Sequence, residues 1–303
     1  MSGRTMRRLM CSLLLLMAVP AISHAQQPQF RVLAFYSEHT EPDHVEFGEQ
    51  AVRFLSKLAK KDQFALQTTT NFADMKPATL RQYRLVLWLN DLPSSPQERA
   101  AFAQYMDSGG GWLGFHIAGY NDSSTNWPWF VGFLGGAVFA SNSWPPLPAT
   151  LRVEDRTSPV TRGLPSSFVS PANEWYIWNP DPRRNKDVRV LLSLDASNYP
   201  LGWKDTLVGG DLPVVWTNTR YRMLYINMGH GDRIFTSPIQ NRLFENAILW
   251  LCTQNQRESG TRARGNSVMQ KAVSFGRLAS LRYTNAIAAP HMLRYSRNQD
   301  TGP

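Results

Sequence analysis

The stretch DSGGGWLGFHIAGY, residues 107–120, decides the fold. Three consecutive glycines end a helical pattern, and the apolar run at residues 112–115 then predicts a strand that is buried on both faces. The strand runs into a corner of small residues that contains His116. This layout is typical of a strand-to-helix elbow at the carboxyl end of a central strand, where open α/β sheets bind their ligands. His116 is therefore a candidate for chemistry, and a core or capping histidine is the alternative.

Strands and helices alternate on both sides of this stretch. Apolar and β-branched runs predict earlier strands at residues 30–36, 64–70 and 84–89, and helices at about residues 43–61 and 96–106. The second half predicts strands at residues 151–153, 188–194, 213–216 and 223–228, and a closing helix at 239–252. This alternation predicts an α/β fold built on a doubly wound, mostly parallel sheet.

Residues 1–25 resemble a secretory signal peptide. Arg4, Arg7 and Arg8 precede an apolar run at residues 13–22, and the small residues around Ala25 suit cleavage. A retained anchor is the alternative, although the run is shorter than the roughly 20 residues of a spanning helix. No later segment is long and apolar enough to cross a bilayer. We therefore expect an exported protein, periplasmic or secreted, with no transmembrane segment after cleavage.

The formal net charge of +9 is concentrated at the two ends of the chain. Residues 26–255 contain 21 basic and 21 acidic side chains, whereas residues 256–303 contain eight basic side chains against Glu258 and Asp300. A neutral body argues against nucleic acid as a partner. We expect one α/β domain at residues 26–255, followed by a basic and mostly disordered tail at 256–303. The tail could instead contact an anionic surface.

Tryptophan is common in the irregular segment at residues 121–148. This aromatic-rich insertion follows the central strand, so it could line the ligand crevice, or its rings could seal a small satellite core. The residues that we expect to bind a substrate by stacking are Trp127, Trp129, Trp175 and Tyr176.

Three histidines each follow a separate predicted strand, so one crevice could gather them. They are His44, His116 and His230, with His39 as a further candidate in the loop before His44, and Glu174 and Asp232 as the best-placed carboxylates. In one hypothesis, His44, His116, His230 and Glu174 bind a divalent metal such as Zn²⁺. In the other, no metal binds, and His116 or His230 acts as a general base oriented by Asp232 or Glu174.

Three motifs together resemble the ThuA-like (trehalose utilisation) family over about residues 30–253. They are GGGWLGFH at 109–116, EWY at 174–176 and GHG at 229–231. The resemblance implies a flavodoxin-like fold related to class I glutamine amidotransferases, which carry a cysteine nucleophile on the elbow and a His-x-Glu pair late in the sheet. Here His116 is at the elbow and His230-Gly231-Asp232 stands at the later motif. After removal of the signal only Cys252 remains, so thiol-dependent glutamine hydrolysis is excluded.

The resemblance also implies a role in the catabolism of disaccharides and other sugars, often in exported proteins. Our leading hypothesis is an exported protein acting on a small-molecule carbohydrate, either a disaccharide or an oxidised sugar, as a sugar-modifying or hydrolytic enzyme. His116 and His230 would be central to catalysis, with Glu174 and Asp232 in support and His44 at the rim. The alternatives are a non-catalytic saccharide-binding module, which would use Trp144 as well, and a scaffold of an exported complex.

Overall fold

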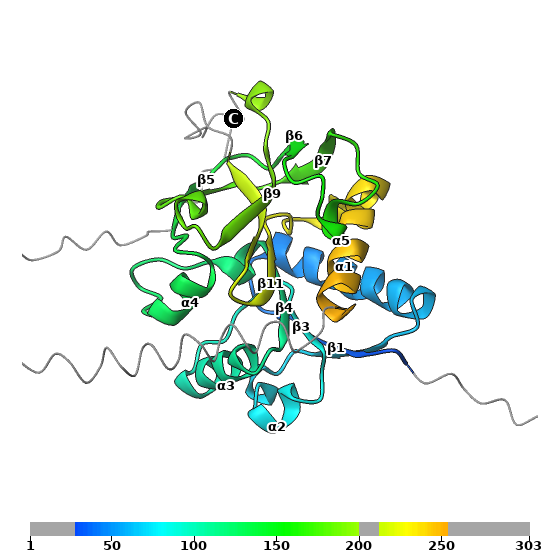
Figure 1. The fold of residues 1–303 in the computed structure, drawn as a ribbon, viewed down its shortest axis with the longest axis vertical. Coiled ribbons are helices and arrows are strands. Elements are labelled where there is room, and N and C mark those ends of the chain that lie inside the picture. Colours follow the sequence, from blue (N-terminus) through cyan, green and yellow to red (C-terminus); the bar gives the residue numbers. More distant parts are fainter. Residues whose placement is uncertain (1–27, 200–211, 254–303) are drawn as a thin grey trace, which may run out of the picture.

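The computed structural model describes residues 28–199 and 212–253 (Figure 1). The predicted signal peptide at residues 1–25 and the predicted basic tail at 256–303 lie outside the described residues. Among the residues that are described, none of the helices combines the length and apolarity that crossing a bilayer requires.

A nine-stranded mixed sheet forms the centre of the protein (Figure 1). In order of pairing, its strands are β2 (Ala65–Thr69), β1 (Arg31–Phe35), β3 (Leu85–Trp88), β4 (Gly111–Phe115), β11 (Arg222–Ile226), β10 (Pro213–Asn218), β9 (Val188–Leu194), β6 (Leu147–Val153) and β7 (Ser167–Asn173). The pairs from β2 to β11 are parallel, and the pairs from β11 to β7 are antiparallel. The predicted α/β class with a doubly wound sheet is therefore confirmed.

Helices cover both faces of the parallel half of the sheet (Figure 1). The elements are α1 (Pro42–Lys61) and α5 (Pro238–Thr253) on one face, and α2 (Pro77–Leu80), α3 (Pro96–Asp107) and α4 (Pro128–Phe133) on the other. Successive residues of a strand point to opposite faces. On β4, Leu113 accordingly packs in the core with α1 and α5, while Trp112 packs in the core with α3 and α4.

The antiparallel half was only partly predictable from sequence. β7 was not predicted, because Pro171 and the polar residues of its SFVSPAN sequence are unusual in a strand. A proline is tolerated here because β7 is an edge strand of the nine-stranded sheet. β5 (Phe139–Asn142) and β8 (Tyr176–Trp178) were also not predicted, and they pair as a separate two-stranded sheet.

The aromatic-rich insertion contributes to the core around α3. Trp127 is buried, and its ring stacks on that of Phe130 with a centroid distance of 4.7 Å. Phe130 in turn lies 5.7 Å from the ring of Trp88 in β3. Much of the insertion therefore seals a hydrophobic core, which was the alternative that the sequence left open.

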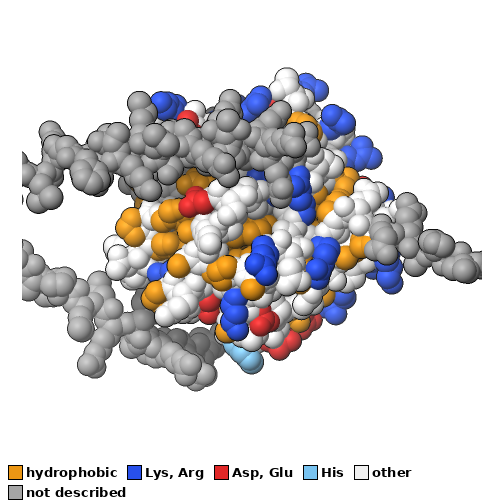
Figure 2. Space-filling model, turned by 60° about the horizontal axis from the view of Figure 1, so that its bottom comes forward, with side chains coloured by type: hydrophobic (Ala, Val, Ile, Leu, Met, Phe, Trp, Pro, Cys, Tyr) orange, Lys and Arg blue, Asp and Glu red, His pale blue; other side chains and the backbone are white. Residues whose placement is uncertain are grey.

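Charged and hydrophobic side chains share the surface shown in Figure 2. Lys and Arg lie mainly in the right half and along the upper rim of that view, hydrophobic side chains are more common on the left, and Asp and Glu lie mostly near the bottom.

Candidate functional site

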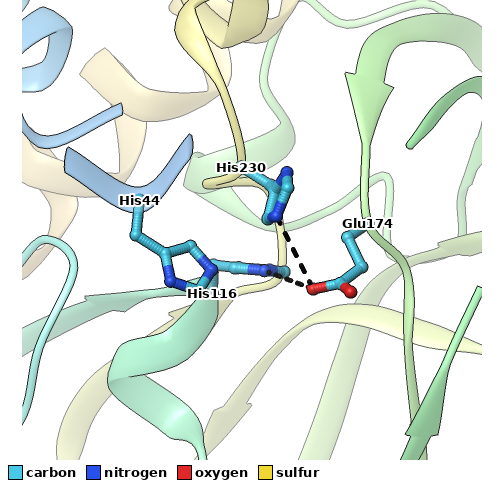
Figure 3. A group of neighbouring side chains, drawn as sticks. All are labelled: His44, His116, Glu174 and His230. Atoms are coloured by element: carbon cyan, nitrogen blue, oxygen red, sulfur yellow. Dashed lines mark hydrogen bonds and ion pairs between the residues drawn. The ribbon is translucent and has the colours of Figure 1, made fainter. Parts of the chain in front are cut away.

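Three histidines meet at the carboxyl edge of the parallel strands (Figure 3). His44 belongs to the first turn of α1, which follows β1; His116 directly follows β4; and His230 follows β11. The ring centroids are 5.2 Å apart for His44 and His116, 5.0 Å for His44 and His230, and 5.5 Å for His116 and His230. Parallel topology brings these rings together because β4 pairs with β11 and with β3, which pairs with β1.

His116 occupies the tight turn that the sequence predicted. Its φ of +45° lies in the left-handed region, which is uncommon for residues other than glycine. The side chain is fully buried, and its ring lies 4.1 Å from the ring of Tyr176. The hydroxyl of Tyr225 donates a hydrogen bond to the carbonyl oxygen of His116 over 2.9 Å. The strand end and these two tyrosines therefore hold the imidazole in one place.

Glu174 lies beside two of the imidazoles, in the turn between β7 and β8. Its Oε2 is 3.3 Å from Nε2 of His116 and 3.9 Å from Nε2 of His230 (Figure 3). Its other oxygen, Oε1, accepts a hydrogen bond from the side-chain amide of Asn142 in β5. The predicted association of Glu174 with His116 and His230 is therefore present in the structure.

Two buried asparagines that the sequence analysis did not select build the walls of the site. Oδ1 of Asn173 accepts hydrogen bonds from the backbone N–H groups of Gly229, over 3.0 Å, and His230, over 3.1 Å. The backbone carbonyl oxygen of Asn227 lies 2.8 Å from Nδ1 of His116. A carbonyl oxygen can only accept, so Nδ1 of His116 carries the proton and Nε2 faces Glu174. An asparagine at a strand end is a weak signal, so sequence alone could not identify them.

One ligand atom from each of His44, His116, His230 and Glu174 can be chosen so that all four atoms lie within 4.8 Å of one another. Nε2 of His44 is buried and has no hydrogen-bond partner among the described residues. A buried polar atom without a partner is unfavourable, which indicates that this nitrogen needs a ligand. We call these four residues the histidine cluster.

The environment of the cluster disfavours protonated imidazole. Burial, with the neighbouring His116 and His230, lowers the pKa of His44 from its ordinary value of 6.5 to about 3. Burial and the proximity of His230 lower the pKa of His116 well below its ordinary value, although its hydrogen bond to Asn227 opposes this shift. Both rings are therefore neutral near pH 7, which is the form that binds metal ions.

Two further carboxylates lie next to the cluster, and both were missed in the sequence analysis. Oδ2 of Asp43 is 3.4 Å from Nδ1 of His230, and Oε2 of Glu41 is 3.6 Å from Nδ1 of His44. Glu41, Asp43 and His230 themselves form a second group of closely spaced ligand atoms. Acidic residues at the start of a helix are common, so their sequence pattern did not distinguish them from ordinary capping residues.

The structure does not support Asp232 as a partner of the histidines. Asp232 is exposed at the start of the short 3₁₀ helix η6 (Asp232–Thr236), and the carboxylates recorded beside His230 are Glu41, Asp43 and Glu174. The prediction for Asp232 is wrong because η6 begins immediately after the glycine turn and turns this side chain outward. His39 is also exposed and lies outside the cluster.

The predicted stacking surfaces are mostly not accessible. Trp175 is fully buried and Trp127 is nearly so, which means that neither indole can stack on a sugar, and those two predictions are wrong. Trp129 is half-buried against Phe133. Tyr176 is buried against His116, so it supports the cluster from behind. By contrast, 38% of Trp144 is exposed, two residues beyond the Asn142 that contacts Glu174.

The fold and the cluster define a doubly wound α/β protein with three histidines and one glutamate at the carboxyl edge of its parallel strands. The profile of the ThuA family, described as trehalose utilisation, matches residues 31–251, and the chain belongs to this family. The predicted family resemblance is thereby confirmed. Family membership indicates a role related to trehalose utilisation.

Two solved structures of ThuA-like proteins resemble this chain. One, from Bacteroides uniformis, is 51% identical, with a TM-score of 0.74, and the match covers 78% of this chain and 96% of that one. The other, from Parabacteroides merdae, is 16% identical, with a TM-score of 0.55, and the match covers 75% of this chain and 92% of that one. The second similarity is one of fold alone. A search of curated proteins found no match.

Proposed function

We propose that this protein is an exported enzyme that acts on a carbohydrate, a disaccharide or an oxidised sugar, with a divalent metal held by the histidine cluster. The observation that carries the proposal is the convergence of His44, His116, His230 and Glu174 within 4.8 Å at the carboxyl edge of the sheet. The family's link to trehalose utilisation supports the sugar, and the signal-like residues 1–25 support export.

The donor set fits a divalent transition metal. Imidazole nitrogens and one carboxylate oxygen suit Zn²⁺ and similar ions, whereas Ca²⁺ and Mg²⁺ prefer oxygen ligands. The buried Nε2 of His44 would gain the partner that it lacks among the described residues. The neutral state of His44 and His116 also removes the competition from protons.

The bound ion would supply a Lewis acid that polarises an oxygen of the sugar or of water. The chain's own residues do the rest. Asn142 donates a hydrogen bond to Oε1 of Glu174, which leaves Oε2 facing Nε2 of His116. Tyr176 closes the site behind His116, so water and substrate must approach from another side. The carboxylates of Glu41 and Asp43, whose side chains are 51% and 41% exposed, lie where the cluster meets solvent.

The contact between His116 and Glu174 also supports the alternative without a metal. Nε2 of His116 keeps its lone pair because Nδ1 is protonated, and a neutral imidazole beside the carboxylate can accept a proton as a general base. Both mechanisms require His116, but only the first requires that the purified protein bind an ion.

The experiment that separates the two mechanisms combines metal analysis with matched histidine variants. Full-length protein expressed in metal-replete medium would be analysed for Zn, Mn, Ni and other divalent metals, together with H116A, H230A and H39A. We expect one ion per wild-type or H39A chain and none in H116A or H230A. His39 is the control because it is exposed and lies in the loop between β1 and α1, outside the histidine cluster. Wild-type protein without metal that still converts sugar would instead establish the acid–base mechanism.

Activity would be assayed with trehalose and with its oxidised, keto-sugar derivatives, and products would be detected by mass spectrometry. We expect turnover by wild-type and H39A protein and a loss of at least about 100-fold in H116A, because both mechanisms require this imidazole. Saccharide binding without any product, and unaffected by H116A, would favour the non-catalytic binding module. Export would be tested by sequencing the amino terminus of the protein recovered outside the cytoplasm, where cleavage after Ala25 is expected.

A further inference from the structure

We infer that the N-cap and the first turn of α1 form a carboxylate clamp, in which Asp43 positions His230 and Glu41 positions His44 for metal binding, with neither carboxylate acting as a ligand. This inference rests on the proposed function, because it assigns roles to the residues around the same site. Of the three carboxylates near His230, Glu174 would then be a metal ligand, whereas Glu41 and Asp43 would be positioning residues.

Asp43 contacts the loop of His230 at two points. Its Oδ2 lies 3.4 Å from Nδ1 of His230, and its backbone carbonyl oxygen accepts a hydrogen bond from the N–H of Gly231 over 2.9 Å. A side-chain contact and a backbone contact on adjacent residues fix the direction of the ring as well as its position. The start of α1 therefore holds the loop that follows β11, which carries His230, against the site.

Glu41 is itself held by the helix that it caps. It is the N-cap residue of α1, and Oε2 accepts a hydrogen bond from the backbone N–H of His44 over 3.3 Å. The same oxygen lies 3.6 Å from Nδ1 of His44. By capping the 20-residue helix α1, Glu41 thus places its carboxylate beside the ring of His44, three residues later.

All three imidazoles follow one pattern, with Nδ1 next to an oxygen acceptor. The acceptors are the Asn227 carbonyl for His116, Asp43 for His230 and Glu41 for His44. A neutral imidazole carries one N–H, and an oxygen acceptor beside one ring nitrogen favours the proton there. At His116 the hydrogen bond of 2.8 Å leaves the lone pair on Nε2. The carboxylates 3.4 Å from Nδ1 of His230 and 3.6 Å from Nδ1 of His44 favour the same tautomer, and oxygen partners of this kind are the usual second layer of histidine metal sites.

The opposing interpretation is that Glu41 is itself a ligand, because its Oε2 also lies 3.7 Å from Nε2 of His230. Exposure argues against it. The side chain of Glu41 is 51% exposed, whereas that of Glu174 is 14% exposed and is fixed by Asn142. The buried and fixed carboxylate is the better preorganised ligand.

The test measures Zn²⁺ affinity by competition with a chromophoric chelator in full-length protein and its variants. We expect D43A and E41A to weaken binding about 10- to 100-fold, the range typical of lost partners of metal-ligating histidines. D43N and E41Q, which retain an oxygen acceptor, should recover most of this loss. D232A is the matched control, because Asp232 is an exposed carboxylate two residues after His230, and it should bind Zn²⁺ as tightly as wild type. E174A should bind more weakly than any of these variants.

Cobalt(II) provides a second measurement that a purely structural role would not change. The visible absorption of bound Co²⁺ reports the geometry of its ligands, so D43A should alter the spectrum and D43N should restore it. Unfolding of the metal-free variants would confirm that each is folded before affinity is compared. Equal affinities of D43A and wild type would overturn the role of Asp43, and E41A as weak as E174A would make Glu41 a ligand. Wild-type protein that binds neither ion would overturn the proposed metal site itself and the clamp with it.

Discussion

Gly229 packs directly against His116. A Cβ placed on Gly229 would lie only 2.5 Å from Cβ of His116, which is far inside van der Waals contact. The loops that carry His116 and His230 therefore meet at a position where only glycine fits. This close approach allows the side chains of two separate strand ends to reach the same site.

Replacing Gly229 by alanine should damage the site by forcing these loops apart. We expect G229A to destabilise the protein by about 1–3 kcal/mol, the usual cost of overpacking, and to weaken metal binding at least tenfold. Gly132 is a matched control, because an added Cβ there would meet nothing within 4 Å. Urea unfolding and chelator competition would measure both effects. If G229A and G132A behaved alike, the close contact would have no functional importance.

Acid should destabilise the metal-free protein through His44. The pKa of this residue is about 3 in the folded protein against an ordinary value of 6.5, so the unfolded chain binds the extra proton between these pH values. The stability that the depressed pKa of His44 contributes to the folded protein is fully present above pH 6.5 and is lost as the pH falls towards 3. One such group gives a slope of up to about 1.4 kcal/mol per pH unit.

The variant H44Q should therefore show a shallower pH dependence than wild type, and H39Q should not. Urea unfolding at several pH values between about 5 and 7 would measure the slopes, in a range where most carboxylates stay ionised. Parallel curves for H44Q and wild type would mean that His44 is protonated equally easily in the folded and unfolded states.

The tryptophans should separate into binding and structural residues. Trp144 is the exposed tryptophan among the described residues, so we expect W144A to leave stability nearly unchanged and to weaken sugar binding by about tenfold if its ring stacks on the ligand. Trp175 is fully buried, and W175A should cost about 3–5 kcal/mol of stability. Calorimetric titration with trehalose and urea unfolding would measure these effects. Normal binding by W144A would exclude this indole from the ligand site.

The cysteine in α5 should be chemically inert in the folded protein. Burial raises the pKa of the Cys252 thiol to about 12, so almost no thiolate is present at pH 8. Iodoacetamide should leave the Cys252 peptide unmodified in native protein and alkylate it in urea, as measured by mass spectrometry. Rapid alkylation of native protein with simultaneous loss of activity would point to a thiol mechanism, which the sequence argues against.

The local pattern of the sequence predicts the parallel half of the fold well. The helix that begins at Pro96 has Ser95 as its cap in a capping box with Glu98, and both were visible in the sequence as a serine before proline and an acid in the first turn. Strand β9 has the predicted bounds of residues 188 and 194. These elements were predictable because each depends on neighbouring residues alone. The edge strand β7 carries no such local signal.

The carboxylates of the site were harder to predict than its histidines. His116 and His230 could be selected from sequence because each follows a predicted strand in a segment with nearby glycines, and the structure brings the two rings together. Asp232 was chosen because it is close to His230 in sequence, whereas Asp43 contacts that ring from another element. Proximity in sequence does not determine which way a side chain points after a glycine turn with a φ of +82° at Gly231.

The sequence by itself determined the α/β class, the tight turn at His116 and the absence of a nucleophilic thiol from that turn, because these depend on local periodicity and residue identity. Only the tertiary structure decided which residues surround the imidazoles. Their partners come from the start of α1, from the turn before β8, from β8 itself and from the loop after β11, and these segments meet only when the sheet is assembled. Burial in the same step makes Trp127 and Trp175 part of the core and leaves Trp144 exposed to solvent.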